Sequence, residues 1–142
     1  AGTGDLLPKM IRRVAQLKMG ANFHFTGFLK GNDVDQMFAM SDVFVMPSIS
    51  EPFGIVPLEA MRLDVPCVIS KQSGVSEVLE NVLKVDFWDI NGLADSIYGL
   101  CHYPKVSDHF KKAGKEEVDN LKWEFASKKI KDVYEKAINL KK

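Results

Sequence analysis

The chain has 142 residues, of which 46% are hydrophobic, and its 19 basic and 19 acidic residues leave a formal net charge of zero. A chain of this length is typical of one domain with its own core, so we expect a single domain over residues 1–142. The balanced charge argues against nucleic acid as a main partner, because binding to phosphates requires a basic surface. No apolar run approaches the roughly 20 residues of a membrane span, and the first residues lack a signal-peptide pattern.

The two cysteines, Cys67 and Cys101, form no Cys-x-x-Cys pair. A chain with this proportion of apolar residues needs no disulfide, so we expect two buried free thiols. Free thiols are typical of a reducing compartment, and we therefore predict a cytoplasmic location.

Helical and strand patterns alternate from the first residues onward. Leu6–Leu17 has apolar residues at intervals of three and four, which predicts an amphipathic helix that ends at Gly20. Asn22–Gly27 alternates apolar and polar residues and predicts a strand. Asp33 is expected to cap a short helix that reaches Met40.

The middle of the chain contains two almost continuously apolar runs. Asp42–Pro47 predicts a strand covered on both faces, and Val65–Ser70 predicts a second one. Between them a polar loop leads into a helix over about 55–63, with Pro57 in its first turn. The later pattern predicts a short helix over Ser73–Leu79, a strand at 83–85, a helix capped by Asn91, and helices at 107–121 and 124–140.

Strands separated by helices indicate crossover connections, so the predicted fold class is α/β, a parallel sheet with helices on both faces. The last two helices are expected to pack on the outside of this sheet. The final helix is amphipathic, with an apolar stripe that runs from Phe125 to Ile138. The methionines are interpreted as core residues: Met37, Met40, Met46 and Met61.

The loop after the first apolar strand has residues suited to ligand binding, since ligands of parallel sheets bind beyond the carboxyl ends of the strands. It carries Glu51 and Gly54 directly into a helix, and Glu59 follows eight residues after Glu51. Gly54 has no Cβ, and the free N–H groups at the helix start favour an anion such as a phosphate. The two carboxylates can accept hydrogen bonds from sugar hydroxyls. A nucleotide-diphosphate sugar fits this arrangement, while the alternative is that both glutamates are ordinary surface charges.

Glu51–Met61, which reads EPFGIVPLEAM, resembles the E-x7-E signature of retaining glycosyltransferases with the GT-B fold, the family that contains glycogen and sucrose synthases. The resemblance implies the Rossmann-like C-terminal domain of that fold without its first strand–helix unit. It continues in the same order along the chain through residues 25–29, 41–48, 65–70, 73–78 and 123–124.

The resemblance also implies a role for each residue of the motif. Glu51 would contact the hydroxyls of the donor hexose and stabilise an oxocarbenium-like transition state. The backbone N–H groups of Phe53, Gly54 and Ile55 would hold hexose hydroxyls and the distal phosphate. Glu59 would bind the hydroxyls of the ribose.

Two further segments belong to the implied donor site. The turn with Gly27 and Leu29 would lie along the nucleotide base. Ser73 and Gly74 would line the same cleft, although Ser73 stands where the family often has a second glycine.

The implied protein is a hexosyltransferase, with a glucosyl group expected, that uses a nucleotide-diphosphate sugar without metal or cofactor. The acceptor, a glycan or sugar, would bind an N-terminal domain that is absent from this chain. The family's basic residues that neutralise the leaving diphosphate are also absent, so this chain alone is expected to be inactive. The alternative is a non-catalytic module on the same fold that binds nucleotide sugars or a protein partner.

Overall fold

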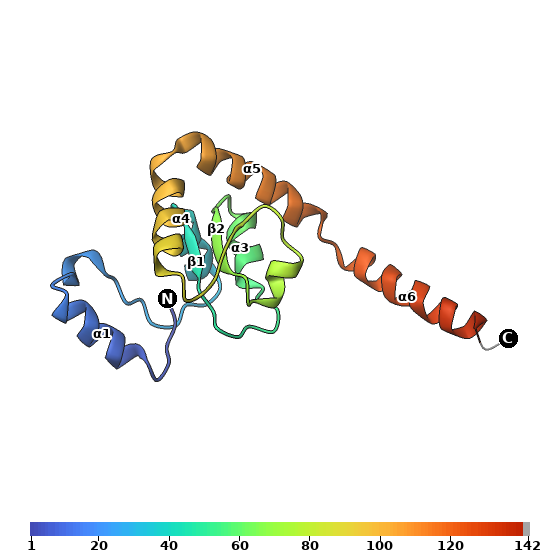
Figure 1. The fold of residues 1–142 in the computed structure, drawn as a ribbon, viewed down its shortest axis with the longest axis horizontal. Coiled ribbons are helices and arrows are strands. Elements are labelled where there is room, and N and C mark those ends of the chain that lie inside the picture. The colour runs from blue at the N-terminus through green and yellow to red at the C-terminus, as the bar shows by residue number, and fades with distance from the viewer. Residues whose placement is uncertain (141–142) are drawn as a thin grey trace. The chain divides into compact units, whose positions relative to one another are not determined.

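The structure is a computed structural model that describes residues 1–140. The chain divides into two compact units, Ala1–Met37 and Phe38–Lys142. Figure 1 shows the course of the chain through both.

The first unit begins with the predicted amphipathic helix, α1 (Leu7–Gln16), and a short 3-10 turn, η1 (Gly20–Asn22). The helix ends before Gly20, which was the predicted stop. Lys18 takes the left-handed conformation instead, with a φ of 56°, and its N–H donates to the carbonyl of Ala15 at 3.0 Å. This is the geometry that usually selects glycine after a helix, so the sequence signal for the end of α1 was misplaced.

The strand predicted over Asn22–Gly27 does not form. Phe23 has extended backbone angles, and its ring stacks on that of Phe25 with centroids 6.2 Å apart. Among the described residues no neighbouring strand pairs with this segment. Asn22 lies in η1 and Gly27 has a positive φ, so the alternating pattern was not sufficient to predict a strand, which also needs a partner for its backbone groups.

The helix that follows, α2 (Asn32–Ala39), begins two residues earlier than expected, since a cap at Asp33 would make Val34 its first residue. Asp33 lies inside its first turn, where its N–H donates to the carbonyl of Lys30 at 3.2 Å, so it does not stand at the cap position. The turn that enters the helix is made by Gly31, which has a φ of 53°.

A parallel three-stranded sheet in the order β1-β2-β3 forms the centre of the second unit. Its strands are β1 (Phe44–Met46), β2 (Cys67–Ser70) and β3 (Leu83–Val85). The central strand β2 is completely buried, as predicted. The strand β1, at the edge of the sheet, is half-buried along its whole length, so its two faces are covered less completely than predicted.

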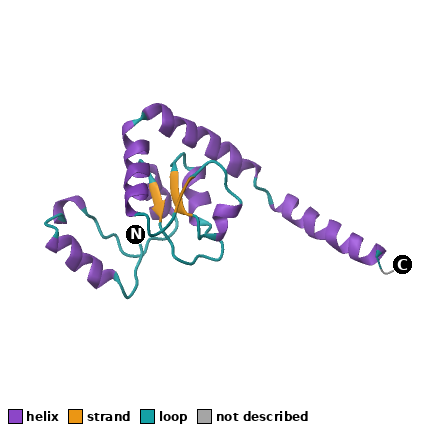
Figure 2. Cartoon of the chain, in the orientation of Figure 1, coloured by secondary structure: helices purple, strands orange, loops and turns teal. Residues whose placement is uncertain are grey.

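Helices cover both faces of this sheet, which confirms the predicted fold class. In Figure 1, α3 and α4 lie on opposite sides of the strands, and Figure 2 shows the strands enclosed between helices. The longer helix α5 packs against both α3 and α4. The bounds of these elements are α3 (Val56–Arg62), η2 (Gly74–Glu77), α4 (Ile90–His102) and α5 (Pro104–Asn120).

Alternate residues of β2 face the two layers. The thiol of Cys67 donates to the carbonyl of Pro57 in α3 at 3.7 Å. Val68 points the other way and packs with Leu100 of α4 in a buried apolar cluster. The core is therefore built on the period of two that a strand between two helix layers requires.

The start of α4 differs from the prediction. Asp89 is the N-cap, and its carboxylate accepts a hydrogen bond from the N–H of Gly92 at 2.9 Å, whereas Asn91 lies inside the first turn. The next helix, α5, begins at Pro104 because proline suits the first turn of a helix.

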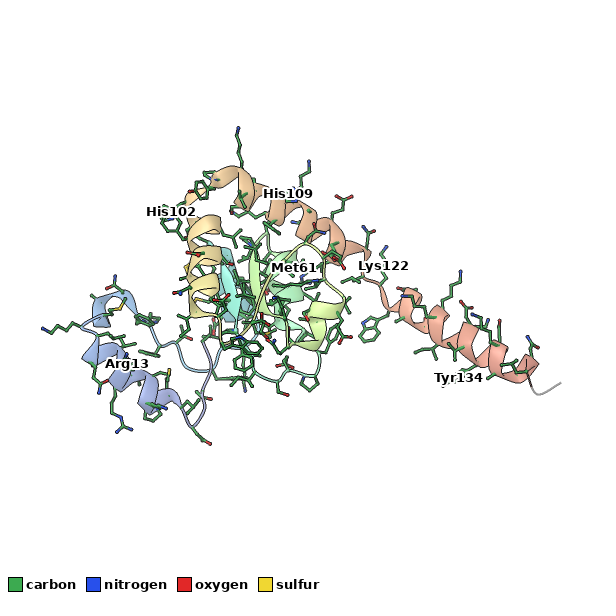
Figure 3. The ribbon with its side chains drawn as sticks, in the orientation of Figure 1. Arg13, Met61, His102, His109, Lys122 and Tyr134 are labelled. Carbon is green, nitrogen blue, oxygen red and sulfur yellow. The ribbon has the colours of Figure 1, made fainter. Side chains whose placement is uncertain are left out.

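Two predictions about buried residues were wrong. Met61 is buried as expected, and Figure 3 shows it inside the second unit, but Met40 is 74% exposed. Cys67 is buried, whereas Cys101 is exposed on α4. Burial raises the pKa of the Cys67 thiol to about 12, because the thiolate would lose its hydration.

The last helix, α6 (Trp123–Asn139), lies within one residue of the predicted bounds. The prediction that it packs on the outside of the sheet was wrong, because α6 extends away from the strands (Figure 1). Its apolar stripe is exposed at Ile130, Val133, Tyr134 and Ile138, while the side chain of Phe125 and residues 141–142 lie outside what the structure describes. Within residues 1–140, none of the helices is long and apolar enough to cross a membrane.

Candidate functional site

Two loops meet at the carboxyl edge of the sheet, residues 47–55 after β1 and residues 71–76 after β2. They form a single parallel bridge between Glu51 and Ser73. The N–H of Gly74 donates to the carbonyl of Glu51 at 2.9 Å, and the N–H of Val75 donates to the carbonyl of Phe53 at 2.7 Å. The backbone of the predicted E-x7-E loop is therefore held by the next loop along the sheet.

Gly74 is needed for this contact. A Cβ at this position would overlap the carbonyl oxygen of Pro52 and come within 3.2 Å of the Cα of Phe53. The two loops approach so closely that no side chain fits between them. Gly74 thus has a packing role within the chain, and its predicted place beside a ligand stays a prediction.

Serine hydroxyls add a second connection that the sequence analysis missed. Ser70 ends β2 and donates its hydroxyl to the carbonyl of Ser48 at 2.6 Å. Ser73 is buried and donates to the carbonyl of Ser70 at 2.7 Å. The sequence shows that the apolar run Val65–Ser70 ends in a serine, but it does not show which group accepts the hydrogen bond of the Ser70 hydroxyl.

The side chain of Glu51 lies over Gly54. Gly54 has a φ of 87°, and a Cβ there would stand 3.0 Å from the Cγ of Glu51 and 3.1 Å from the Cε of Met46. Position 54 therefore requires glycine, both because its φ is positive and because the side chains of Glu51 and Met46 leave little space for a Cβ. The reason given from the sequence, close approach of a ligand, is not needed to explain this residue.

Both predicted carboxylates are free of partners within the described part of the chain. Glu51 and Glu59 are each half-buried, and neither side-chain carboxylate makes a hydrogen bond or an ion pair with any residue in 1–140. Glu59 lies in the first turn of α3, at the N-terminal end of the helix, directly after the loop that carries Glu51. The site therefore offers two acidic acceptors with no intramolecular donor.

The backbone donors between them are also unused. Counting acceptors in residues 1–140 only, the N–H groups of Phe53, Gly54 and Ile55 donate to none. Ile55 precedes α3 without a side-chain cap, and Pro57 in the first turn has no N–H to offer. The loop thus combines free donors with free carboxylates, as a ligand with both hydroxyls and phosphates requires.

A positive charge at the same edge of the sheet is bound by a neighbour. Lys71 follows β2, and its ammonium lies 2.9 Å from the carboxylate of Asp86, which follows β3. Gln72 donates to the other oxygen of Asp86 at 2.8 Å. These hydrogen bonds hold the pKa of Asp86 below its usual range.

Gly27 and Leu29, the residues predicted to lie along the nucleotide base, belong to the first unit. Gly27 has a φ of 72°, and its carbonyl accepts a hydrogen bond from the N–H of Gly2 at 2.6 Å. Leu29 lies in the same connection before α2. Their part in a site with Glu51 stays a prediction.

A surface hollow of about 690 Å³ in the second unit does not include Glu51, Glu59 or the loops that carry the candidate site. It is lined by charged side chains of α5 and by Asp64, which follows the far end of α3. Two of the three histidines, His102 and His109, lie on α4 and α5 (Figure 3), and the described residues hold no cluster of potential metal ligands.

The chain that carries this loop is similar to a known protein family and to named relatives. Residues 1–117 match the model of the family described as "Glycosyl transferases group 1". The chain is 34% identical over 114 residues to the sulfoquinovosyl transferase SQD2 of Arabidopsis thaliana, an alignment that covers 76% of this chain and 22% of that protein.

Solved structures show the same fold. The sucrose-phosphate synthase of Thermosynechococcus elongatus superposes with a TM-score of 0.77 at 27% identity, over 94% of this chain and 34% of that one. Anabaena HepE, solved in complex with UDP-glucose, superposes with a TM-score of 0.74 at 24% identity, over 80% of this chain and 32% of that one. At that lower identity the likeness establishes the fold alone. The chain spans about a third or less of the length of these proteins.

Proposed function

The chain belongs to the glycosyl transferases of group 1, and we propose that it binds the nucleotide-diphosphate sugar from which a retaining enzyme of this family transfers a hexosyl group. The sugar we propose is glucosyl, and the acceptor is a glycan or sugar held by a part of the protein outside this chain. A location in the cytoplasm, where nucleotide sugars are available to a reduced enzyme, belongs to the same proposal.

One observation carries the proposal. Glu51 and Glu59 lie on the loop and helix that follow β1, and neither carboxylate has a partner among residues 1–140, although the backbone around them is tightly held. Charged groups on a rigid backbone with no internal partner are suited to bind an external one. The unused N–H groups of Phe53, Gly54 and Ile55 supply the complementary donors.

The chemistry assigns a different part of the donor to each group. Glu51 accepts hydrogen bonds from the hexose hydroxyls, and its charge stabilises the positive charge that develops on the anomeric carbon. The backbone donors hold hexose hydroxyls and the distal phosphate. Glu59, one helical turn into α3, accepts hydrogen bonds from the two ribose hydroxyls.

The proposed transfer keeps the anomeric configuration. The bond between the anomeric carbon and the diphosphate oxygen breaks, and the acceptor hydroxyl forms a new bond on the same face of the sugar. The proton of that hydroxyl passes to the departing phosphate oxygen, so no protein base is needed. The protein positions the donor and stabilises charge, which are the main sources of rate enhancement in such reactions.

The glucosyl assignment is supported by the EPFGI sequence of the loop and by the relative named sucrose-phosphate synthase. Another relative is named sulfoquinovosyl transferase, so family membership leaves the sugar open. The donor must therefore be identified by experiment.

The test is ligand-observed NMR with UDP-glucose, ADP-glucose, GDP-mannose and free glucose. We expect saturation transfer to the ribose and hexose of one nucleotide sugar, with a Kd in the millimolar range, equivalent to about −4 kcal/mol. Glu59→Ala should abolish this signal, while Glu116→Ala, a change of an exposed glutamate on α5, should keep it. Equal signals from both variants would contradict the proposed donor site.

A further inference from the structure

The side chain of Ser70 joins two separate segments of the chain near the candidate site. It is the last residue of β2, it is 0% exposed, and its hydroxyl donates to the carbonyl of Ser48 at 2.6 Å. Ser48 lies in the loop after β1, 22 residues earlier in the chain. A buried hydroxyl of the central strand thus bonds to the backbone of the neighbouring loop.

The position of Ser48 makes this bond relevant to Glu51. Glu51 follows three residues after Ser48, and its own carbonyl is held by the N–H of Gly74. The segment from Ser48 to Glu51 is therefore bound at both ends to β2 and its loop. The hydroxyl of Ser73 binds the carbonyl of Ser70, so the second loop is tied to the same residue.

We propose that Ser70 is a positioning residue, whose hydroxyl fixes the Glu51 loop in the conformation that receives the donor sugar. The inference deepens the proposed function and rests on it. Ser70 touches no ligand itself, because it is fully buried. It acts through the Ser48 carbonyl, and through the backbone that carries the free carboxylate of Glu51.

The matched comparison is Ser76. This residue is also buried, and its hydroxyl also donates to a backbone carbonyl, that of Lys71 at 2.8 Å. The bond of Ser76 stays within one loop, whereas the bond of Ser70 joins two. Ser70→Ala and Ser76→Ala each remove one buried hydroxyl, so a difference between them reports the connection between the loops.

The first readout needs no ligand. Hydrogen exchange of the Gly74 and Val75 amides, which donate to the Glu51 loop, should become about three- to tenfold faster in Ser70→Ala, because loss of one bridging hydrogen bond favours local opening. Ser76→Ala should leave these rates within about twofold of the parent. Urea unfolding of both variants shows whether an overall loss of stability accounts for the change.

The second readout is donor binding by the same NMR experiment, with UDP-glucose, ADP-glucose and GDP-mannose as probes. Ser70→Ala should raise the Kd of the bound donor about three- to tenfold, and Ser70→Thr, which keeps the hydroxyl, should restore it. Ser76→Ala should bind like the parent.

The outcomes separate the two claims. If the parent binds no donor, the proposed function fails, and the positioning role, which rests on it, fails with it. If the parent binds a donor and Ser70→Ala binds it equally well, the positioning role is overturned while the proposed function stands. Equal exchange rates in Ser70→Ala and Ser76→Ala would overturn the positioning role in either case.

Discussion

The backbone carbonyl of Glu51 accepts a hydrogen bond at 2.9 Å from the N–H of Gly74, a residue of the next loop of the sheet. The carboxylate of Glu51 has no partner among residues 1–140, but its backbone is held by Gly74, which has no side chain. The backbone that carries the candidate acid is therefore held by residues whose contacts with it are not visible in the sequence. Gly74 is the most restrictive of them, because it leaves no space for a Cβ.

Gly74→Ala should destabilise the protein by about 1–3 kcal/mol, since the new Cβ must push the Pro52 carbonyl away. The same change at Gly99, which lies in the interior of α4 with nothing within 4 Å of its Cβ position, should stabilise by about 0.5–1 kcal/mol. Urea unfolding monitored by circular dichroism measures both. Two variants of equal stability would show that the contact between the loops is not close-packed.

Glu51 and Glu59 should contribute to different parts of the ligand. Glu51→Gln should leave the Kd of the free nucleoside diphosphate within about twofold and weaken binding of the sugar-linked donor, by about 1.5–3 kcal/mol for a hydrogen bond to a charged group. Glu59→Gln should weaken both ligands by a similar factor. Titrations with UDP and UDP-glucose, or the corresponding pair for another base, give the four constants. A Glu51→Gln variant that loses the free diphosphate as well would contradict the assignment.

The ion pair of Asp86 with Lys71 should make a contribution to stability that depends on pH. Because the folded-state pKa of Asp86 is lowered, this contribution is present above the unfolded pKa of about 3.9 and is lost as the pH falls through the folded value. Asp86→Asn should therefore unfold at lower urea concentration than the parent at pH 7. The difference should shrink steadily toward pH 3, and a constant difference across this range would show that the charge of Asp86 is irrelevant.

The two cysteines should react very differently with a thiol reagent. Cys101 is exposed on α4 and should be modified within minutes at pH 8. Cys67 is buried, and the pKa of its thiol is raised to about 12, so it should react only when the protein unfolds. Colorimetric titration is expected to count one thiol in the native protein and two in urea. Cys101→Ser should remove the native reaction entirely.

Local patterns were sufficient to predict most of the elements. The apolar periods of α1, α5 and α6 and the continuous run of β2 correspond to helices and a strand at nearly the expected bounds. Errors arose where two residues competed for one role, as with the cap of α4, which is Asp89 and not Asn91. They also arose where burial depended on neighbours, as with Met40 and Cys101, because an apolar side chain does not specify what covers it.

By itself, the sequence determined the fold class, the family and the loop that carries Glu51 and Glu59, because periodicity and motif spacing are properties of contiguous residues. Only the tertiary structure decided how that loop is held. The bonds from Ser70 to Ser48 and from Gly74 to Glu51 join residues more than 20 positions apart, and they exist because β1 and β2 lie side by side in the sheet. Pairing between distant segments cannot be derived from the residues of either segment alone.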